Sequence, residues 1–499
     1  MSVRYRALSA LLAILMLSAS FAACGDSPAA APSQTAAPDA GDAGEAETTE
    51  APETSILDGL DFNGADFRVS MSDTDISSAE FLVGPEEQTG DIVNDAVFQR
   101  NMDVEERLNI KFKYTTTDVA WSSVADYVRK LVLSGSDDFD LIVNDQRGMS
   151  TDAVEKLLRK AEDCAYFDFT TAGWWVSYMD DLSIKSGETY LLVGDYFMDV
   201  LRRSHLLYYN RSMYENMYGD PDAIYAEVLD HKWTYDSLAK KIENTYIDLD
   251  GDGKVSKDDQ YGLIIGGVGG SIFPWVYGTD CRTYSRDEEG YPQLDFDLDR
   301  AQKLYEKTYA CFYSDGTSTK FGENAKDLHE KFISGTALFI STAEIAQFEN
   351  FRSMEDDIGL VPYPLLDESQ KDYHTVVHDT AEVGAIPLTA ANYDMSSAVV
   401  QALNEATAAS VTPTYYETAL KIKYVRDDYS AQMIDIIHDG ISGLFTLIYG
   451  GAWANDIFTW AFLQPLQKKG DSISSEYEKR YSQAVAGLEK LRETYDSAE

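Results

Sequence analysis

Apolar and polar positions follow two different periods along the first part of the chain. Residues 65–72 (ADFRVSMS) alternate between apolar and polar and predict a strand. Residues 91–114 have apolar side chains at helical spacing and then predict a strand, whereas residues 121–135 predict a helix that ends at a glycine. Residues 138–145 (DFDLIVND) are mostly apolar, as in a buried parallel strand. This succession of strands and helices predicts an α/β fold.

The pattern continues toward the C-terminus without an internal repeat. Residues 232–246 predict an amphipathic helix with Thr234 as its N-cap, because apolar side chains recur on one face. The C-terminal quarter has mainly helical periodicity. The other expected elements are strands at 188–196, 203–210, 260–265, 336–341 and 357–364, and helices at 296–313 and 324–335.

The N-terminal residues predict export and attachment to a membrane. Arg4 and Arg6 precede an apolar run that is short for a membrane span and ends in small residues, which is typical of a signal peptide at residues 1–23. The sequence FAAC resembles a bacterial lipobox, with Phe21 in place of the usual leucine, so Cys24 is the expected lipidation site. An ordinary cleaved signal followed by an unrelated cysteine is the alternative.

Residues 24–55 are expected to form a lipidated cysteine followed by a disordered tether. The segment after Cys24 contains no Leu, Ile, Val or aromatic residue, so it cannot bury enough apolar surface to offset the loss of chain entropy. With acyl chains on Cys24, this arrangement predicts a protein anchored at the extracellular face of the cytoplasmic membrane.

Charge and cysteine content narrow the possible chemistry. The 85 Asp and Glu residues outnumber the 41 Lys and Arg residues and give a formal net charge of −44, which would repel nucleic acid. The cysteines after Cys24 are Cys164, Cys281 and Cys311. A disulfide between Cys281 and Cys311 and simple burial of both thiols remain open.

An acidic segment, DLDGDGKVSKDD at residues 248–259, has the spacing of an EF-hand calcium loop. No clear exiting helix and no second loop of this kind follow, so we expect a structural calcium ion that joins a helix to the next strand. An empty acidic turn is the alternative. The expected ligands are the side chains of Asp248, Asp250, Asp252, Ser256 and Asp259 and the backbone carbonyl of Lys254.

Several short segments occur in the order found in one protein family. They are VND, LLVGDY, LLYYN, KWTYDSLAKKI before the acidic loop, FISGTALFI, DIGLVPYPLLDESQKDY, PTYYETALKIKYVRDD and GGAWANDIF. Over about residues 60 to 460, the chain resembles the extracellular solute-binding proteins of bacterial ABC importers, in the carbohydrate-type branch (family 1) related to maltose-binding proteins. The resemblance implies an α/β, two-lobed, periplasmic-binding-protein-like fold with a ligand cleft between the lobes and a helical C-terminal part.

The resemblance also implies a division of the chain and a set of partners. Lobe 1 is expected at residues 56–195 plus 362–425, and lobe 2 at residues 196–361 plus 426–499. A monomer would capture its ligand by hinge closure, without catalysis, and deliver it to the permease subunits of an ABC transporter. The expected ligand is a mono- or oligosaccharide, while peptides, polyamines and other polar solutes stay open.

Candidate ligand contacts come from strand ends and from the resemblance. Asn144 and Asp145 end a predicted parallel strand, where open α/β sheets bind ligands, although both could instead cap the next turn. Sugar sites combine flat aromatic rings with carboxylates and amides that bind hydroxyls. Trp275 and Trp453 match positions of cleft aromatics in the family, with core packing as the alternative. The other candidates are Trp175, Asp195, Tyr196, Asp280 and His378.

No catalytic motif stands out in the sequence. The motifs HExxH, GxSxG and GxxxxGK[ST] are absent, and among 85 Asp and Glu residues no glycosidase pair can be singled out. A secreted glycan-active enzyme or a glycan-binding surface protein is the alternative function, followed by a calcium-regulated adaptor.

Overall fold

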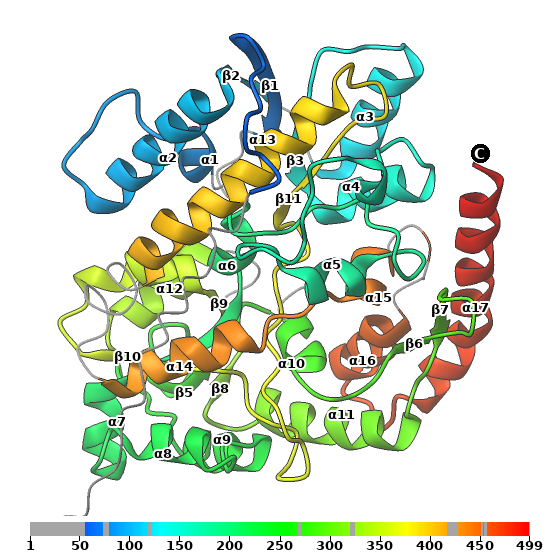
Figure 1. Cartoon of the computed structure of the whole chain (residues 1–499). Helices are drawn as coiled ribbons and strands as arrows, with labels where there is room; N and C mark the ends of the chain where they lie inside the picture. The colour runs from blue at the N-terminus through cyan, green and yellow to red at the C-terminus, as the bar shows by residue number, and fades with distance from the viewer. Residues whose placement is uncertain are drawn as a thin grey trace, which may run out of the picture. The chain divides into compact units, whose positions relative to one another are not determined.

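Two β-sheets organise the folded part of the chain (Figure 1). The computed structural model describes residues 55–72, 79–117, 119, 121–267, 272–319, 325–416, 428–450, 453 and 457–498, all in one unit that begins at Ser55. The predicted signal peptide, Cys24 and residues 25–54 of the predicted tether lie outside the described residues.

The first sheet has four strands in the order β11-β3-β1-β2. β1 pairs in parallel with β2 and β3, whereas β11 is antiparallel to β3, so Glu382 at the start of β11 lies opposite Asp145 at the end of β3. All residues of β3 are buried, as expected for a parallel strand. The strands are β1 (Ala65–Ser72), β2 (Ile110–Thr117), β3 (Leu141–Asp145) and β11 (Glu382–Ala385).

Helices pack around the first sheet, and α2 lies against α13 (Figure 1). α2 begins where Asp91 caps the N–H groups of Val93 and Asn94, and its buried face includes Val97, Val104 and Leu108. The helices are α1 (Ala79–Val83), α2 (Ile92–Leu108), α3 (Val124–Leu133), α4 (Gln146–Val154), α5 (Val176–Leu182), α6 (Asp199–Arg202) and α13 (Tyr393–Ala406).

The second sheet has five strands in the order β10-β4-β9-β5-β8. β4 is antiparallel to both β10 and β9, whereas β5 is parallel to β9 and β8. The strands are β4 (His205–Asn210), β5 (Tyr261–Ile264), β8 (Thr317–Ser318), β9 (Ala337–Glu344) and β10 (Ile358–Val361). Around this sheet are α7 (Arg211–Tyr218), α8 (Ala223–Leu229), α9 (Tyr235–Ile242), α10 (Phe273–Tyr277), α11 (Leu298–Phe312), α12 (Ala325–Ile333) and α14 (Asp428–Asp439).

The C-terminal helices contact elements around both sheets. α16 packs against α10 and α11, whereas α17 packs against α16 and also against α4. Tyr495 of α17 shares a hydrogen bond of 2.9 Å with the hydroxyl of Tyr190, which precedes α6. The elements are α15 (Phe445–Ile448), α16 (Ile457–Lys468), α17 (Ser474–Ser497) and the hairpin of β6 (Tyr284–Arg286) and β7 (Pro292–Leu294).

The α/β class and most predicted elements are confirmed, including the cap of α9, where the Thr234 hydroxyl accepts the N–H of Ser237. The strand predicted at 188–196 is wrong. That segment makes only isolated bridges, Trp174 with Gly194 and Leu192 with Gly384, because it crosses between other elements. The lobe boundaries stay predictions.

Two further observations concern covalent links and membrane spans. Cys164, Cys281 and Cys311 are free, and Cys281 and Cys311 are buried thiols, so the disulfide considered from the sequence is not formed. In the part of the chain that the structure describes, no helix combines the length and apolar character needed to cross a membrane.

The buried carboxylate of Asp140 gives a test of the first sheet. It receives the backbone N–H of Arg68 at 2.8 Å and two guanidinium nitrogens of Arg68 at 2.9 and 2.8 Å, which ties β1 to the chain before β3. Asp140→Ala should lower the free energy of unfolding by about 2 kcal/mol in urea titrations, a value reduced because Arg68 is partly exposed. Asp66→Ala is the control, since Asp66 is exposed and lies 3.9 Å from Lys113. Equal effects of the two changes would contradict the assignment.

Candidate functional site

A cavity of about 820 Å³ lies between elements that pack around different sheets. Part of its wall comes from residues 173–178, from Asp195 and from residues 412, 413 and 416 beyond α13. The rest comes from Asp435, His438 and Asp439 of α14, a helix that packs against α8 and β10, and from Ile441. The volume is within the range of about 300–1,000 Å³ that is typical of ligand sites.

Trp175 and Asp195, both predicted from the sequence, are held side by side by a short backbone pairing. Trp174 and Gly194 form an antiparallel bridge, and the N–H of Asp195 donates to the carbonyl of Gly173 at 2.7 Å. The indole Nε1 of Trp175 then donates to Oδ1 of Asp195 at 2.7 Å. The ring is therefore fixed by one edge while it remains half-buried in the cavity wall.

Each of the two paired segments requires a glycine. Gly173 has φ +96°, and a Cβ on Gly194 would lie 2.2 Å from Oδ1 of Asn404. That same oxygen accepts the N–H of Tyr196 at 3.1 Å. The close approach to Asn404 on α13 thus sets the position of Asp195.

Aromatic rings and carboxylates lie together in the cavity wall. The ring centroid of His438 is 5.5 Å from that of Trp175 and 5.6 Å from that of Tyr416, both edge-on. The hydroxyl of Tyr416 donates to Oδ1 of Asp435 at 2.8 Å. Burial raises the pKa of Asp195, although the hydrogen bond from Trp175 opposes this. Flat aromatic rings can pack against the C–H groups of a sugar ring, and the neighbouring carboxylates can accept hydrogen bonds from its hydroxyls.

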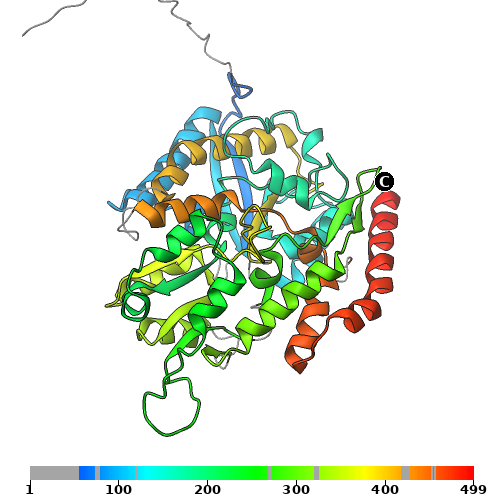
Figure 2. The same cartoon turned by 90° about the horizontal axis from the view of Figure 1, so that it is seen from below.

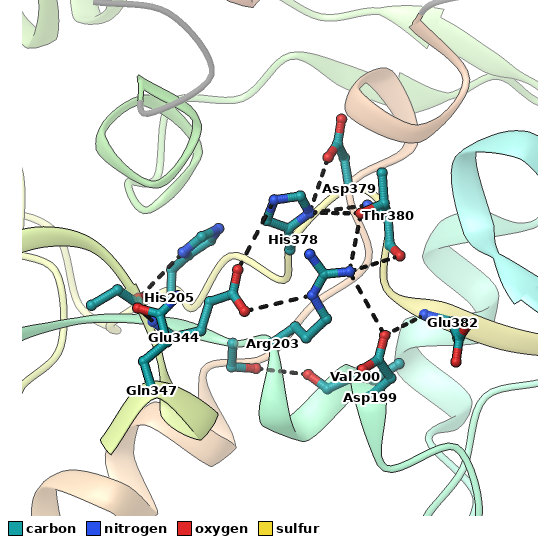
Figure 3. A network of polar contacts seen from close by, with 12 residues as sticks. Asp199, Val200, Arg203, His205, Glu344, Gln347, His378, Asp379, Thr380 and Glu382 are labelled. Carbon is teal, nitrogen blue, oxygen red and sulfur yellow. Dashed lines mark hydrogen bonds and ion pairs between the residues drawn. The ribbon is translucent and has the colours of Figure 1, made fainter. Parts of the chain in front are cut away.

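A second group of polar side chains, which we call the junction network, lies between the end of β9 and the start of β11 (Figure 3). Its members are Asp199, Arg203, His205, Glu344, His378, Asp379 and Thr380. The side chain of Arg203, only 6% exposed, lies 3.5 Å from Glu344 and 3.9 Å from Asp199. Its Nη1 also donates to the carbonyl and the hydroxyl oxygen of Thr380, both at 3.0 Å. Glu344 ends β9 of the second sheet and Thr380 precedes β11 of the first, so one guanidinium joins both.

Burial disfavours the charged form of two histidines of this network. The rings of His205 and His378 have centroids 5.7 Å apart. Burial lowers the pKa of each to about 3, and the positive charge of Arg203 adds to the effect at His378. Nδ1 of His378 accepts the N–H of Thr380 at 3.2 Å. Burial raises the pKa of Glu344 to about 7, although Arg203 opposes this. The predicted ligand residue His378 is therefore one part of a packed network.

Asn144 and Asp145 lie beside the junction network. Oδ1 of Asp145 accepts the N–H of Gly148 at 2.7 Å, so Asp145 does cap α4. Its other oxygen, Oδ2, and Nδ2 of Asn144 are buried and have no hydrogen-bond partner among the described residues. Arg147 extends the network by pairing with Asp379 at 2.6 Å. Buried polar atoms of this kind can bind a ligand group or an ordered water.

Tyr178 connects the cavity to the junction network. It lines the cavity, and its hydroxyl donates to Oε1 of Gln146 at 2.9 Å. Nε2 of Gln146 donates in turn to the carbonyl of His378 at 3.0 Å. A ligand that moves the cavity wall can therefore affect the network through two hydrogen bonds.

Trp275 and Tyr196 lie in the core. Trp275 is 0% exposed, and its Nε1 donates to the hydroxyl of Ser341 at 2.8 Å. Tyr196 is also 0% exposed, with the guanidinium carbon of Arg100 5.0 Å from its ring centroid. Rings without exposed surface cannot stack on a ligand in this conformation, so burial favours core packing for both.

Asp280 and Trp453 lie apart from the cavity wall as described. Asp280 is exposed and accepts Nε of Arg300 at 2.8 Å, which makes it a surface ion-pair residue. Trp453 is half-buried, and the ammonium of Lys490 on α17 lies 5.7 Å from its ring centroid. This contact favours packing against the C-terminal helix.

The acidic loop of residues 248–259 extends away from the second sheet, between α9 and β5 (Figure 2). Asp248, Asp250 and Asp252 each place one carboxylate oxygen within 4.8 Å of the others. The carboxylate of Asp248 accepts the N–H of Gly253 at 2.8 Å, and the ammonium of Lys254 lies 2.9 Å from Asp252. Three converging carboxylates are a donor set that fits calcium.

Asp259 is used differently from the other acids of the loop. It is buried, and its two oxygens accept the N–H groups of Ser256 at 2.7 Å and Leu249 at 3.3 Å. These hydrogen bonds lower its pKa, with that from Ser256 the largest cause. Asp259 therefore closes the loop on itself and is not among the three converging carboxylates.

Sequence reasoning missed Tyr416 and three residues of α14. Asp435, His438 and Asp439 are spaced i, i+3 and i+4, which places them on one face of a helix. That spacing was visible in the sequence, but nothing local distinguishes a face toward a cavity from one toward solvent.

The capping carboxylate of Asp145 gives a pH test. Burial raises its pKa from 3.8 to about 6, so its stabilising contribution is complete below about pH 4 and is lost as the pH rises through 6. Asp145→Asn keeps an oxygen for the cap, and its stability relative to the wild type should therefore increase between pH 4 and pH 6 and then level off. Thermal unfolding across pH 4–8 measures this. Asp91→Asn, at the exposed cap of α2, should show no comparable gain, and a flat difference for Asp145→Asn would contradict the burial argument.

Comparisons with known proteins agree on the fold. A scan of protein-family models and a search of curated proteins found no match. Among solved structures, the maltose/maltodextrin-binding domain MalE from Bdellovibrio bacteriovorus, bound to maltotriose, has a TM-score of 0.52 at 11% identity over 86% of this chain and 100% of that one. The GacH receptor of Streptomyces glaucescens GLA.O, studied unliganded and with acarbose, has a TM-score of 0.51 at 12% identity over 85% and 99%.

A third similar structure binds another type of sugar. The galacto-N-biose-/lacto-N-biose I-binding protein of the ABC transporter from Bifidobacterium longum, in complex with lacto-N-biose, has a TM-score of 0.52 at 11% identity over 86% of this chain and 98% of that one. At such identities the likeness concerns the fold. The chain has the two-lobed, periplasmic-binding-protein-like α/β fold that its sequence predicted.

Proposed function

We propose that this chain is an extracellular solute-binding protein that captures a mono- or oligosaccharide and delivers it to the permease of an ABC transporter. The cavity that carries Trp175 and Asp195 is the main support, because it combines fixed aromatic rings with carboxylates in a volume of about 820 Å³. The sugars bound by the three similar structures, maltotriose, acarbose and lacto-N-biose, support the same ligand class.

Capture would proceed by hinge closure, without chemistry on the ligand. Asp195 is the last residue of the first segment of the predicted lobe 1, whereas α14 belongs to the predicted lobe 2 and packs against β10 and α8. Both contribute side chains to the cavity wall. A ligand that contacts both parts binds the closed form better and so shifts the population toward it. The proposal extends to a lipid anchor at Cys24, which would keep the protein near its permease.

Replacement of the cavity tryptophan tests this function. A thermal-shift screen of sugars should first identify a ligand, because a ligand at 100 times its Kd adds about 2.7 kcal/mol of stability. Trp175→Ala should then weaken binding by about 10- to 30-fold in calorimetry, since it removes a stacking surface. Trp460→Ala is the matched control, because this tryptophan is 39% exposed on α16 and does not line the cavity as described.

Two results would contradict the proposal. Small-angle scattering that shows no compaction with a bound ligand would exclude hinge closure. Release of smaller products from an incubated oligosaccharide would favour a glycan-active enzyme.

We also propose a structural calcium ion in the acidic loop. Asp248, Asp250 and Asp252 would hold it, together with the carbonyl of Lys254 and the side chain of Ser256. The ion would offset the repulsion among the three carboxylates and so stabilise the connection between α9 and β5. Extracellular calcium is sufficient to fill even a site of modest affinity.

Removal of calcium tests this site. EGTA should lower the melting temperature by about 2–4 °C, because a ligand that binds only the folded state contributes to its stability. A variant with Asp250→Asn and Asp252→Asn should melt at the same temperature with and without EGTA. Unchanged melting of the wild type, together with loss of sugar binding, would show that calcium does not act as a structural ion.

A further inference from the structure

The electrostatics of the cavity restrict the class of sugar that fits it. Carboxylates of Asp195, Asp435 and Asp439 share the wall. The only other titratable groups among the described lining residues are two tyrosines and His438, whose Nδ1 lies 3.2 Å from Asp439. The described part of the wall therefore contains three carboxylates and no lysine or arginine.

Asp195 is the most consequential of these carboxylates because it is half-buried, whereas the side chain of Asp439 is 83% exposed. Its Oδ1 accepts the indole N–H of Trp175 at 2.7 Å, and the hydroxyl of Thr412 is a second hydrogen-bonding neighbour. Both are neutral donors, so neither cancels its charge, whereas the imidazole of His438 also acts on Asp195 electrostatically. Partial burial of a carboxylate is costly, and a cationic ligand group beside it would reduce that cost.

The aromatic part of the wall also suits a cation. The faces of tryptophan and tyrosine rings attract ammonium groups, and Trp175 and Tyr416 both line the cavity. The ring of Trp175 is held by its N–H edge, lies in edge-on contact with the ring of His438 and stays half-buried in the cavity wall. The same wall can therefore stack on a sugar ring and attract an amine carried by that sugar.

The charge of the whole chain acts in the same direction over longer distances. A formal net charge of −44 attracts cations and repels anions, and clefts of one sign concentrate this field. Salt weakens this contribution, because the Debye length falls from about 30 Å at 0.01 M to about 8 Å at 0.15 M ionic strength.

Building on the proposed sugar capture, we propose that the cavity selects amine-bearing sugars, with Asp195 as the main residue that recognises the ammonium group. N-acylated sugars of the same skeleton bind more weakly, and acidic sugars are excluded. An ammonium group adds a charge–charge attraction to the carboxylate that an amide N–H lacks, and this corresponds to about a tenfold preference for the amine.

The experiment compares three disaccharides on the full extracellular chain by calorimetry at pH 7. They are the β-1,4-linked disaccharide of glucosamine, its N,N′-diacetyl form and a disaccharide that contains a uronic acid. The free amine should bind about tenfold more tightly than the diacetyl form, and this ratio should shrink when the salt concentration is raised from 10 to 150 mM. The uronic acid should bind most weakly.

Single-residue variants test which carboxylate is responsible for the preference for the amine-bearing disaccharide. Asp195→Asn keeps an oxygen for the Trp175 N–H but removes the charge, so it should abolish most of the amine preference, measured as the ratio of the dissociation constants of the two disaccharides for the same variant. Asp439→Asn should reduce the preference less, because that side chain is 83% exposed. Asp230→Asn removes an exposed charge that is paired with Lys232 outside the cavity, and it should change nothing. Circular dichroism melting confirms that each variant is folded.

The outcomes separate this inference from the function on which it rests. Equal or tighter binding of the diacetyl or acidic disaccharide would overturn the amine preference and leave sugar capture intact. An amine preference that persists in Asp195→Asn would overturn the role of Asp195. If no amine-bearing, neutral or acidic sugar binds, both the preference and sugar capture are wrong.

Discussion

The guanidinium of Arg203 joins the two halves of the molecule. It is almost completely buried and reaches Glu344 at the end of β9 in one sheet and Thr380 just before β11 in the other. Taking a charge out of water is costly unless its partners are well placed, so a shift of either strand end would leave a buried charge unsatisfied. This requirement fixes the end of β9 relative to the start of β11. It also restricts the path of residues 375–381, which lead into β11.

The cavity and the junction network form one continuous polar region. Tyr178 and Gln146 connect them, so a change in the position of α5 is transmitted to the backbone of His378. Burial lowers the pKa of its two histidines and raises the pKa of Glu344 to about 7. Closure around a ligand would therefore act on groups whose charge states respond to small changes in burial. The C-terminal helices contact elements around both sheets, since α17 contacts α4 while α16 contacts α11.

Much of the fold could be predicted from local patterns. Alternation gave β1, helical periodicity with a capping threonine gave α9, and an apolar run ending in VND gave β3 with Asp145 at its edge. Trp175 and Asp195 were also candidates from their positions, and both line the cavity. Trp275 was placed in the core by packing against residues such as Tyr363, which lies far away in the sequence. No local signal distinguishes a buried tryptophan from one in a cleft.

The sequence by itself determined the α/β class, most strand and helix positions and the acidic loop, because each depends on the spacing of residues within one short segment. Tertiary structure alone decided which charges meet. Arg203 and Glu344 are separated by more than a hundred residues, and the spacing of Asp435, His438 and Asp439 on α14 gained meaning only when that helix was placed opposite Trp175. Contacts of this kind depend on how complete elements pack, and the cost of burying charge selects among those packings.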